Sequence, residues 1–163
     1  INLGVTSKSV QFVTSQAGNV LAFVQQGDLW SYNISTNKMT QVFSFREGRD
    51  TDDRYDYSMH DFKIVRVEEN GDMDFVFYGY MNRGEHEGYT GTCVYHYYSE
   101  QNVLEEKFFL PTTKSYEFMK RGVEILSYVS TDELLYLMLD GSLYQINMQD
   151  KTYQIVKEDI AKD

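Results

Sequence analysis

The sequence is short of cysteine, of basic residues and of long apolar runs, and each shortage excludes a class of protein. Cys93 is the only cysteine, so the chain holds neither an intrachain disulfide nor a cysteine-based metal site. Its apolar runs are all shorter than the roughly 18–20 residues that a membrane-spanning helix needs. We therefore expect no direct membrane insertion of this segment.

Basic side chains are outnumbered by acidic ones. The chain has 15 Lys and Arg against 25 Asp and Glu, which gives a formal net charge of −10. Affinity for nucleic acid rests on Lys and Arg that displace counterions from phosphates, and adsorption to anionic membranes needs the same positive charge. The charge balance therefore predicts no nucleic-acid partner and is typical of a soluble, acidic domain.

Aromatic residues, in contrast, are abundant. The chain has 14 Tyr, 10 Phe and one Trp, and aromatics make up 15% of it. Flat and β-branched side chains pack well on a pleated surface, and no stretch shows the apolar stripe of a helix. The composition predicts a single all-β domain over residues 1–163.

An internal repeat gives this domain its architecture. The segment Gly27-Asp-Leu-Trp-Ser-Tyr-Asn-Ile matches Gly141-Ser-Leu-Tyr-Gln-Ile-Asn-Met position by position, and Val94-Tyr-His-Tyr fits the same frame. Val94 lies 65 residues after Leu29 (94 − 29) and 49 residues before Leu143 (143 − 94). The shorter spacing is close to that of a β-propeller blade, and the longer one implies inserted loops.

Each copy divides into four strands joined by turns. Asn70-Gly71 and Asp140-Gly141 favour tight hairpins, because type I′ turns need positive φ at both central residues. The second strand of the first and third copies is almost continuously apolar, over 20–24 and 134–139, as expected for a strand buried on both faces. The expected strands are 9–14, 19–25, 28–34 and 39–45 in the first copy, 61–68, 73–80, 92–98 and 103–110 in the second, and 123–129, 133–139, 142–148 and 152–157 in the third.

These units predict three consecutive four-stranded antiparallel blades of a β-propeller, with blade one at 9–45, blade two at 61–110 and blade three at 123–157. A two-sheet sandwich, which uses the same turns, is the alternative. The chain begins with Ile1 rather than Met, so we expect a partial propeller excised from a longer protein. Three blades are too few to close a ring. The open faces therefore predict self-association or contact with the remaining blades of the parent chain.

Strand parity places the long loops together. Because successive strands reverse direction, the connections 46–60, 82–91 and 112–121 should all emerge at one end, and the short turns at the other. Loops carry binding residues because the strands hold them in place. The candidate ligand-binding side chains on these loops are Tyr55, Asp56, Tyr57, Arg83, Glu85, His86 and Tyr116.

Two of these loops also carry residue types that can bind a metal ion or take part in catalysis. The aspartates of 46–60 could offer oxygens to Ca²⁺, but the spacing lacks the glycine and distal glutamate of a calcium loop, and nearby arginines offset the charge. Whether that loop binds calcium is left open. The consecutive Glu85, His86 and Glu87 would point in opposite directions on an extended chain. No nucleophile, zinc or phosphate-loop motif is present, so no catalytic residue, no metal and no cofactor is predicted.

Several stretches carry a resemblance to a wider group of proteins. They are Tyr57-Ser-Met-His-Asp-Phe-Lys-Ile, Tyr78-Gly-Tyr-Met-Asn-Arg-Gly-Glu-His-Glu-Gly and Leu139-Asp-Gly-Ser-Leu-Tyr. Through them the chain resembles β-propeller repeat proteins, in particular propeller-like ectodomains of uncharacterised bacterial surface proteins. The resemblance implies a scaffold and an extracytoplasmic location, at the cell surface or membrane-anchored through other parts of the parent chain. The motifs of the WD40, kelch and sialidase propellers are absent, so no family residues carry over.

These observations favour a non-enzymatic binding or sensing module with a protein or carbohydrate ligand, bound on the face that carries the three long loops. Two alternatives stay open. One is a fragment of a propeller-type enzyme such as a glycoside hydrolase, and the other is an architectural spacer.

Overall fold

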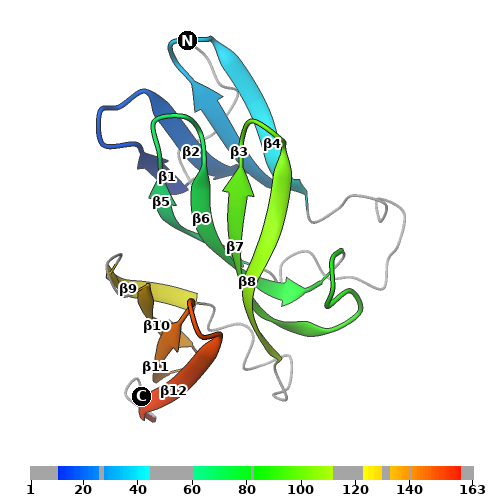
Figure 1. The fold of residues 1–163 in the computed structure, drawn as a ribbon, viewed down its shortest axis with the longest axis vertical. Coiled ribbons are helices and arrows are strands. Elements are labelled where there is room, and N and C mark those ends of the chain that lie inside the picture. Colours follow the sequence, from blue (N-terminus) through cyan, green and yellow to red (C-terminus); the bar gives the residue numbers. More distant parts are fainter. Residues whose placement is uncertain are drawn as a thin grey trace.

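The computed structural model describes residues 11–25, 28–44, 61–81, 83–111, 123–129, 133–139 and 141–158. These residues form three antiparallel sheets of four strands, each with its strands paired in chain order (Figure 1). The strands are β1 (Gln11–Thr14), β2 (Val20–Gln25), β3 (Asp28–Asn33), β4 (Lys38–Ser44), β5 (Asp61–Val67), β6 (Met73–Tyr80), β7 (Thr90–Tyr98), β8 (Val103–Pro111), β9 (Val123–Val129), β10 (Leu134–Leu139), β11 (Ser142–Asn147) and β12 (Thr152–Lys157).

The predicted all-β class and the three four-stranded units are confirmed. Among the described residues no helix is long and apolar enough to cross a membrane. Blade one comprises β1–β4, blade two β5–β8 and blade three β9–β12. The separate pairing of the three sheets rules out the two-sheet sandwich.

Backbone irregularities recur at the repeat spacing, which confirms the alignment of the three copies. Asn37, Asn102 and Lys151 each adopt positive φ in the turn between the third and fourth strands. They are separated by the same 65 (102 − 37) and 49 (151 − 102) residues as the sequence repeat. A β-bulge also interrupts the pairing of those two strands at one repeat position, between Leu29 and Trp30, Val94 and Tyr95, and Leu143 and Tyr144.

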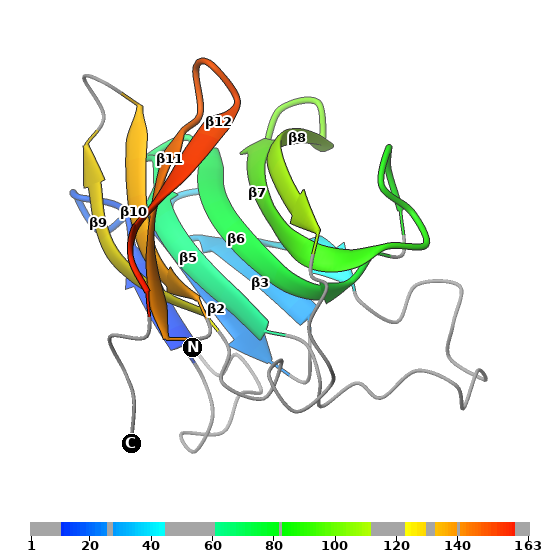
Figure 2. The same cartoon turned by 90° about the horizontal axis from the view of Figure 1, so that it is seen from below.

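Blade two lies between the other two blades, as the two views agree (Figures 1 and 2). One core cluster joins blade one to blade two and includes Phe75 and Phe77 of β6. A second cluster joins blade two to blade three and includes Val76 and Tyr78 of the same strand. Successive β6 side chains point to opposite faces, so this strand is buried on both.

The expectation that β10 is also buried on both faces is wrong. Its burial alternates along the strand, with Leu135, Leu137 and Leu139 buried and the intervening residues half-buried. The reason is that the described blades cover only the face toward blade two. All six residues of β12 are exposed, among them Ile155 and Val156.

Candidate functional site

The strand ends of blade two that flank the three long loops lie together at one end of that blade (Figure 1). β5 begins at Asp61, which pairs with Tyr78, and β8 ends at Pro111, which pairs with Gly91. Blade one contributes the end of β4, since the Ser44 carbonyl accepts a hydrogen bond of 3.1 Å from Arg83 Nη2. Loops 46–60 and 112–121 lie outside the described residues, so their convergence stays a prediction.

The opposite end consists of short turns that bond to one another. The Glu69 carboxylate accepts hydrogen bonds of 3.2 Å from the Ala17 amide, and the Glu69 carbonyl accepts one from Asn19. Within blade two, Asp72 accepts a 2.8 Å bond from the Ser99 amide. The turns at this end therefore bind blade one to blade two.

Met81 and residues 83–89 belong to a folded loop between β6 and β7. The Met81 amide donates to the Tyr89 carbonyl, and the Gly88 amide donates back to the Met81 carbonyl, so the base of the loop is closed. Gly84 and Gly88 have φ of +82° and +96°, values that L side chains rarely adopt. The loop turns between them, so Glu85 and His86 do not lie on an extended chain.

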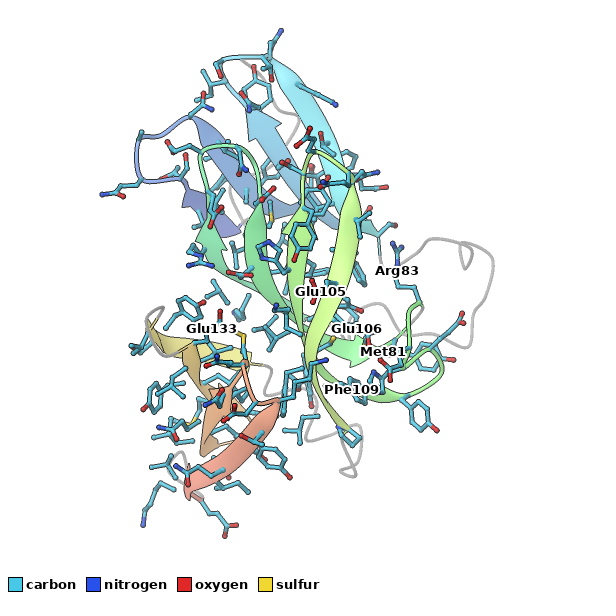
Figure 3. All side chains as sticks on the ribbon, viewed as in Figure 1. Met81, Arg83, Glu105, Glu106, Phe109 and Glu133 are labelled. Carbon is cyan, nitrogen blue, oxygen red and sulfur yellow. The ribbon has the colours of Figure 1, made fainter. Side chains whose placement is uncertain are left out.

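The turn brings two of the predicted residues together beside β8. His86 Nδ1 lies 2.8 Å from Glu106 Oε2, and the imidazole stacks on Phe109 with ring centroids 4.1 Å apart and planes 17° apart. Glu85 joins them, and one donor atom from each of Glu85, His86 and Glu106 lies within 4.8 Å of the other two. Figure 3 shows Glu106 and Phe109 on β8. These residues line a hollow of about 200 Å³ that Lys107 and Lys151 also border.

The bulge in β8 explains why Glu106 and Phe109 share a face. Residues three apart point to opposite faces of a regular strand. Here Glu106 pairs with Tyr95 and Phe109 pairs with Cys93, and the register shift leaves Lys107 as the extra residue. Both side chains therefore face the loop. Sequence reasoning missed Glu106, although its position follows from the repeat once a bulge is assumed in each copy.

Glu106 has one carboxylate oxygen without a hydrogen-bond partner. Its side chain is 12% exposed, and Oε1 is shielded from solvent and has no hydrogen-bond partner. Burial is the main cause of the raised pKa of the Cys93 thiol, and the nearby carboxylate of Glu106 raises it further. Burial, Cys93 and Glu106 together raise the pKa of Tyr95. A negative charge in this position is stabilised by a cation.

Arg83 lies apart from this cluster. Its guanidinium sits 4.7 Å from the centre of the Phe43 ring and bonds to the Ser44 carbonyl, both in blade one. It lines a separate hollow of about 420 Å³ between the outer strands of blades one and two. Figure 3 shows Arg83 separated from Glu106 and Phe109. Arg83 therefore fixes the loop to blade one, and whether it shares a ligand with Glu85 and His86 stays a prediction.

Of the other predicted residues, Tyr55, Asp56, Tyr57 and Tyr116 lie outside the described residues.

A second polar group lies on the face of blade two toward blade three. The buried Asp74 accepts a 2.7 Å bond from Arg66 and lies 2.6 Å from His96 Nδ1. The three residues are paired across β5, β6 and β7, and Arg66 also lies over the Tyr128 ring of blade three. This row joins the two blades.

Comparisons with known proteins identify the fold. No protein-family model and no curated protein sequence matches the chain. Among solved structures, TolB from Acinetobacter baumannii is 11% identical, with a TM-score of 0.54 over 91% of this chain and 32% of that one. An oligogalacturonate lyase in complex with manganese is 15% identical, with a TM-score of 0.52 over 86% of this chain and 33% of that one.

The chain therefore folds as three consecutive blades of a β-propeller. It spans about a third of the length of these two solved structures.

Proposed function

We propose that this chain supplies three blades of a non-enzymatic ligand-binding propeller, whose binding face is the end that carries loops 46–60, 82–91 and 112–121. The observation that supports the proposal is the difference between the two ends. In blades one and two, one end is closed by short turns bonded to each other, whereas the other end carries the loop 81–89, which folds over a hollow beside β8. Such a face resembles the mouths where propellers and barrels bind ligands.

The chemistry of the loop fits a polar ligand with flat faces. Tyr89 is 60% exposed at the base of the loop, where its ring can stack on a sugar or a peptide side chain. Glu85 is exposed and can accept hydrogen bonds from hydroxyl or amide groups. A carbohydrate or protein ligand is therefore the expected partner.

A propeller enzyme fragment is the second candidate, because one of the solved structures with this fold is a lyase. Its catalytic residues would have to span further blades. We favour binding over catalysis because the chain has no recognised catalytic motif. Turnover of oligosaccharides by the parent protein, abolished by substitutions in these blades, would establish the enzyme instead.

Location and partners follow from the same proposal. The resemblance to propeller-like ectodomains of bacterial surface proteins supports an extracytoplasmic location. The exposed β12 supports contact with further blades of a parent chain or with a second copy. Light scattering of the isolated chain decides between a monomer with an open face and a self-associated form.

The binding face is tested with a glycan and peptide array. We expect Tyr89→Ala and Glu85→Gln to weaken binding of any hit at least tenfold. Glu100→Gln, an exposed glutamate in a turn at the opposite end, serves as the matched control and should bind as the wild type does. If Glu100→Gln loses binding while Tyr89→Ala and Glu85→Gln keep it, the ligand binds at the end that carries the short turns, and the proposed binding face is wrong.

A further inference from the structure

We propose that Glu85, His86 and Glu106 form a binding site for a first-row divalent transition ion, with Zn²⁺ as the expected metal. The ion would fasten loop 81–89 to β8. The inference does not rest on the proposed function, because three side chains of one blade supply the protein donors and a water can complete the tetrahedron.

The donor set is the first argument. One imidazole nitrogen and two carboxylate oxygens, all within 4.8 Å of one another, are the ligand types that Zn²⁺ takes in proteins. Ligands about 2.0–2.2 Å from a tetrahedral ion lie roughly 3.3–3.5 Å apart. Closing the trio onto an ion therefore requires only small rotations of exposed or half-buried side chains.

The unsatisfied oxygen of Glu106 is the second, independent argument. Oε2 faces His86, but Oε1 is shielded from solvent and lacks a partner. A carboxylate oxygen in that position costs free energy unless it is paired. A metal ion supplies the missing bond.

The surroundings hold the donors in place before any ion arrives. Phe109 stacks against the His86 ring and fixes its plane. Gly84 leaves room for the carboxylate, since a Cβ there would lie 2.5 Å from Glu106 Oε1. Metal sites in proteins typically have ligands whose orientation is fixed by neighbouring residues, and these contacts meet that requirement.

The other two blades provide an internal comparison. The repeat spacings align Glu106 with Gln41 (106 − 65) and Ile155 (106 + 49), and the three residues pair with equivalent aromatic residues, Trp30, Tyr95 and Tyr144. Neither Gln41 nor Ile155 carries a charge. The chain also passes from the second to the third strand over only 26–27 and 140–141 in those blades, against 81–89 in blade two. The acid and the loop that carries the other two donors therefore occur together, in one blade only.

The test is isothermal titration of the full chain, freed of metal with a chelator, with Zn²⁺, Co²⁺ and Ca²⁺ in turn. We expect one equivalent of Zn²⁺ per chain and visible absorption from bound Co²⁺. Ca²⁺ should bind at least tenfold more weakly, because it takes oxygen ligands and makes little use of a histidine nitrogen. Zn²⁺ should also raise the melting temperature of the wild type.

Substitutions assign the binding to this site. Glu106→Gln reproduces the residue of blade one and should weaken Zn²⁺ binding at least tenfold, as should His86→Gln. Glu105→Gln is the matched control, because this neighbouring carboxylate bonds to Tyr98 and not to the trio. Circular dichroism checks each fold, and Glu85→Gln, at an exposed position, gives a third donor variant that does not disturb packing.

Absence of saturable Zn²⁺ binding by the wild type would overturn the site. Wild-type affinity for Zn²⁺ in all three donor variants would overturn it as well. Equal affinity for Ca²⁺ and Zn²⁺ would also overturn it, since the histidine would then play no part. If the wild-type chain binds Zn²⁺ at this site but binds no glycan or peptide on the array, only the proposed function is refuted.

Discussion

Phe43 offers the sharpest test of how blade one is held to blade two. It is 1% exposed near the end of β4, and the four aromatic rings that it contacts among the described residues all belong to blade two. The centroid distances run from 5.0 Å, to Phe77, to 6.0 Å, to Phe75. Truncating this side chain therefore removes contacts between blades as well as contacts within one.

The expected cost follows from burial and ring contacts. A buried Phe→Ala substitution destabilises by about 3–5 kcal/mol, and each aromatic pair contributes about 0.5–1.5 kcal/mol beyond its buried area. With several ring partners, Phe43→Ala should lie near about 4 kcal/mol. For a chain of this size that corresponds to a fall in melting temperature of about 8–16 °C.

Phe12 is the matched control. It is the same residue type in the same blade, but it is 45% exposed, and among the described residues its ring contacts only Phe23. Phe12→Ala should cost about 1–2 kcal/mol, because much of its surface stays in water in the folded state.

The assay is urea unfolding followed by two probes. Trp30, the only tryptophan, reports on blade one through its fluorescence, and far-ultraviolet circular dichroism reports on all the sheets. We expect coincident transitions in the wild type, because a shared core couples neighbouring repeats. The reasoning is refuted if Phe43→Ala costs no more than Phe12→Ala.

Three further predictions concern blade two and its turns. Asp74→Ala should destabilise by about 1.5–3 kcal/mol in urea unfolding, because it removes charge-assisted hydrogen bonds to arginine and histidine partners. Gly91→Ala should lower the free energy of unfolding by about 1–3 kcal/mol, because its Cβ would clash with the Leu110 carbonyl oxygen of β8. Gly18→Ala meets no neighbouring atom but keeps a φ of +80°, so it should lower that free energy by only about 1 kcal/mol. Thermal melting measures both. Burial raises the pKa of Asp72, but hydrogen bonds from Ser99 outweigh it and hold that pKa below its ordinary value. The carboxylate then contributes stability above about pH 4 that is lost as the pH falls through the lowered pKa. Asp72→Asn should therefore lose less stability than the wild type as the pH falls below about 4 in acid titrations of stability.

Much of the fold could be predicted from residue patterns, because strand structure is largely local. Turn residues such as Asn70-Gly71 fix where the chain reverses, and the repeat at Leu29, Val94 and Leu143 identifies equivalent strands. The predicted ranges 73–80, 123–129 and 152–157 coincide with β6, β9 and β12. The burial of β10 was not predictable in this way, because it depends on whether another sheet covers its second face.

The candidate site shows the same division. The sequence determined that a glycine-rich loop with Glu85 and His86 interrupts blade two, since composition and spacing are enough to locate an insertion. Only the tertiary structure decided that the loop turns back onto β8 and that a bulge directs Glu106 toward it. Likewise it placed Arg83 over Phe43 in the neighbouring blade instead of beside His86. The physical reason is that periodicity gives the face of a residue only within a regular strand, whereas positive-φ turns, bulges and contacts between sheets depend on the folded arrangement of the whole chain.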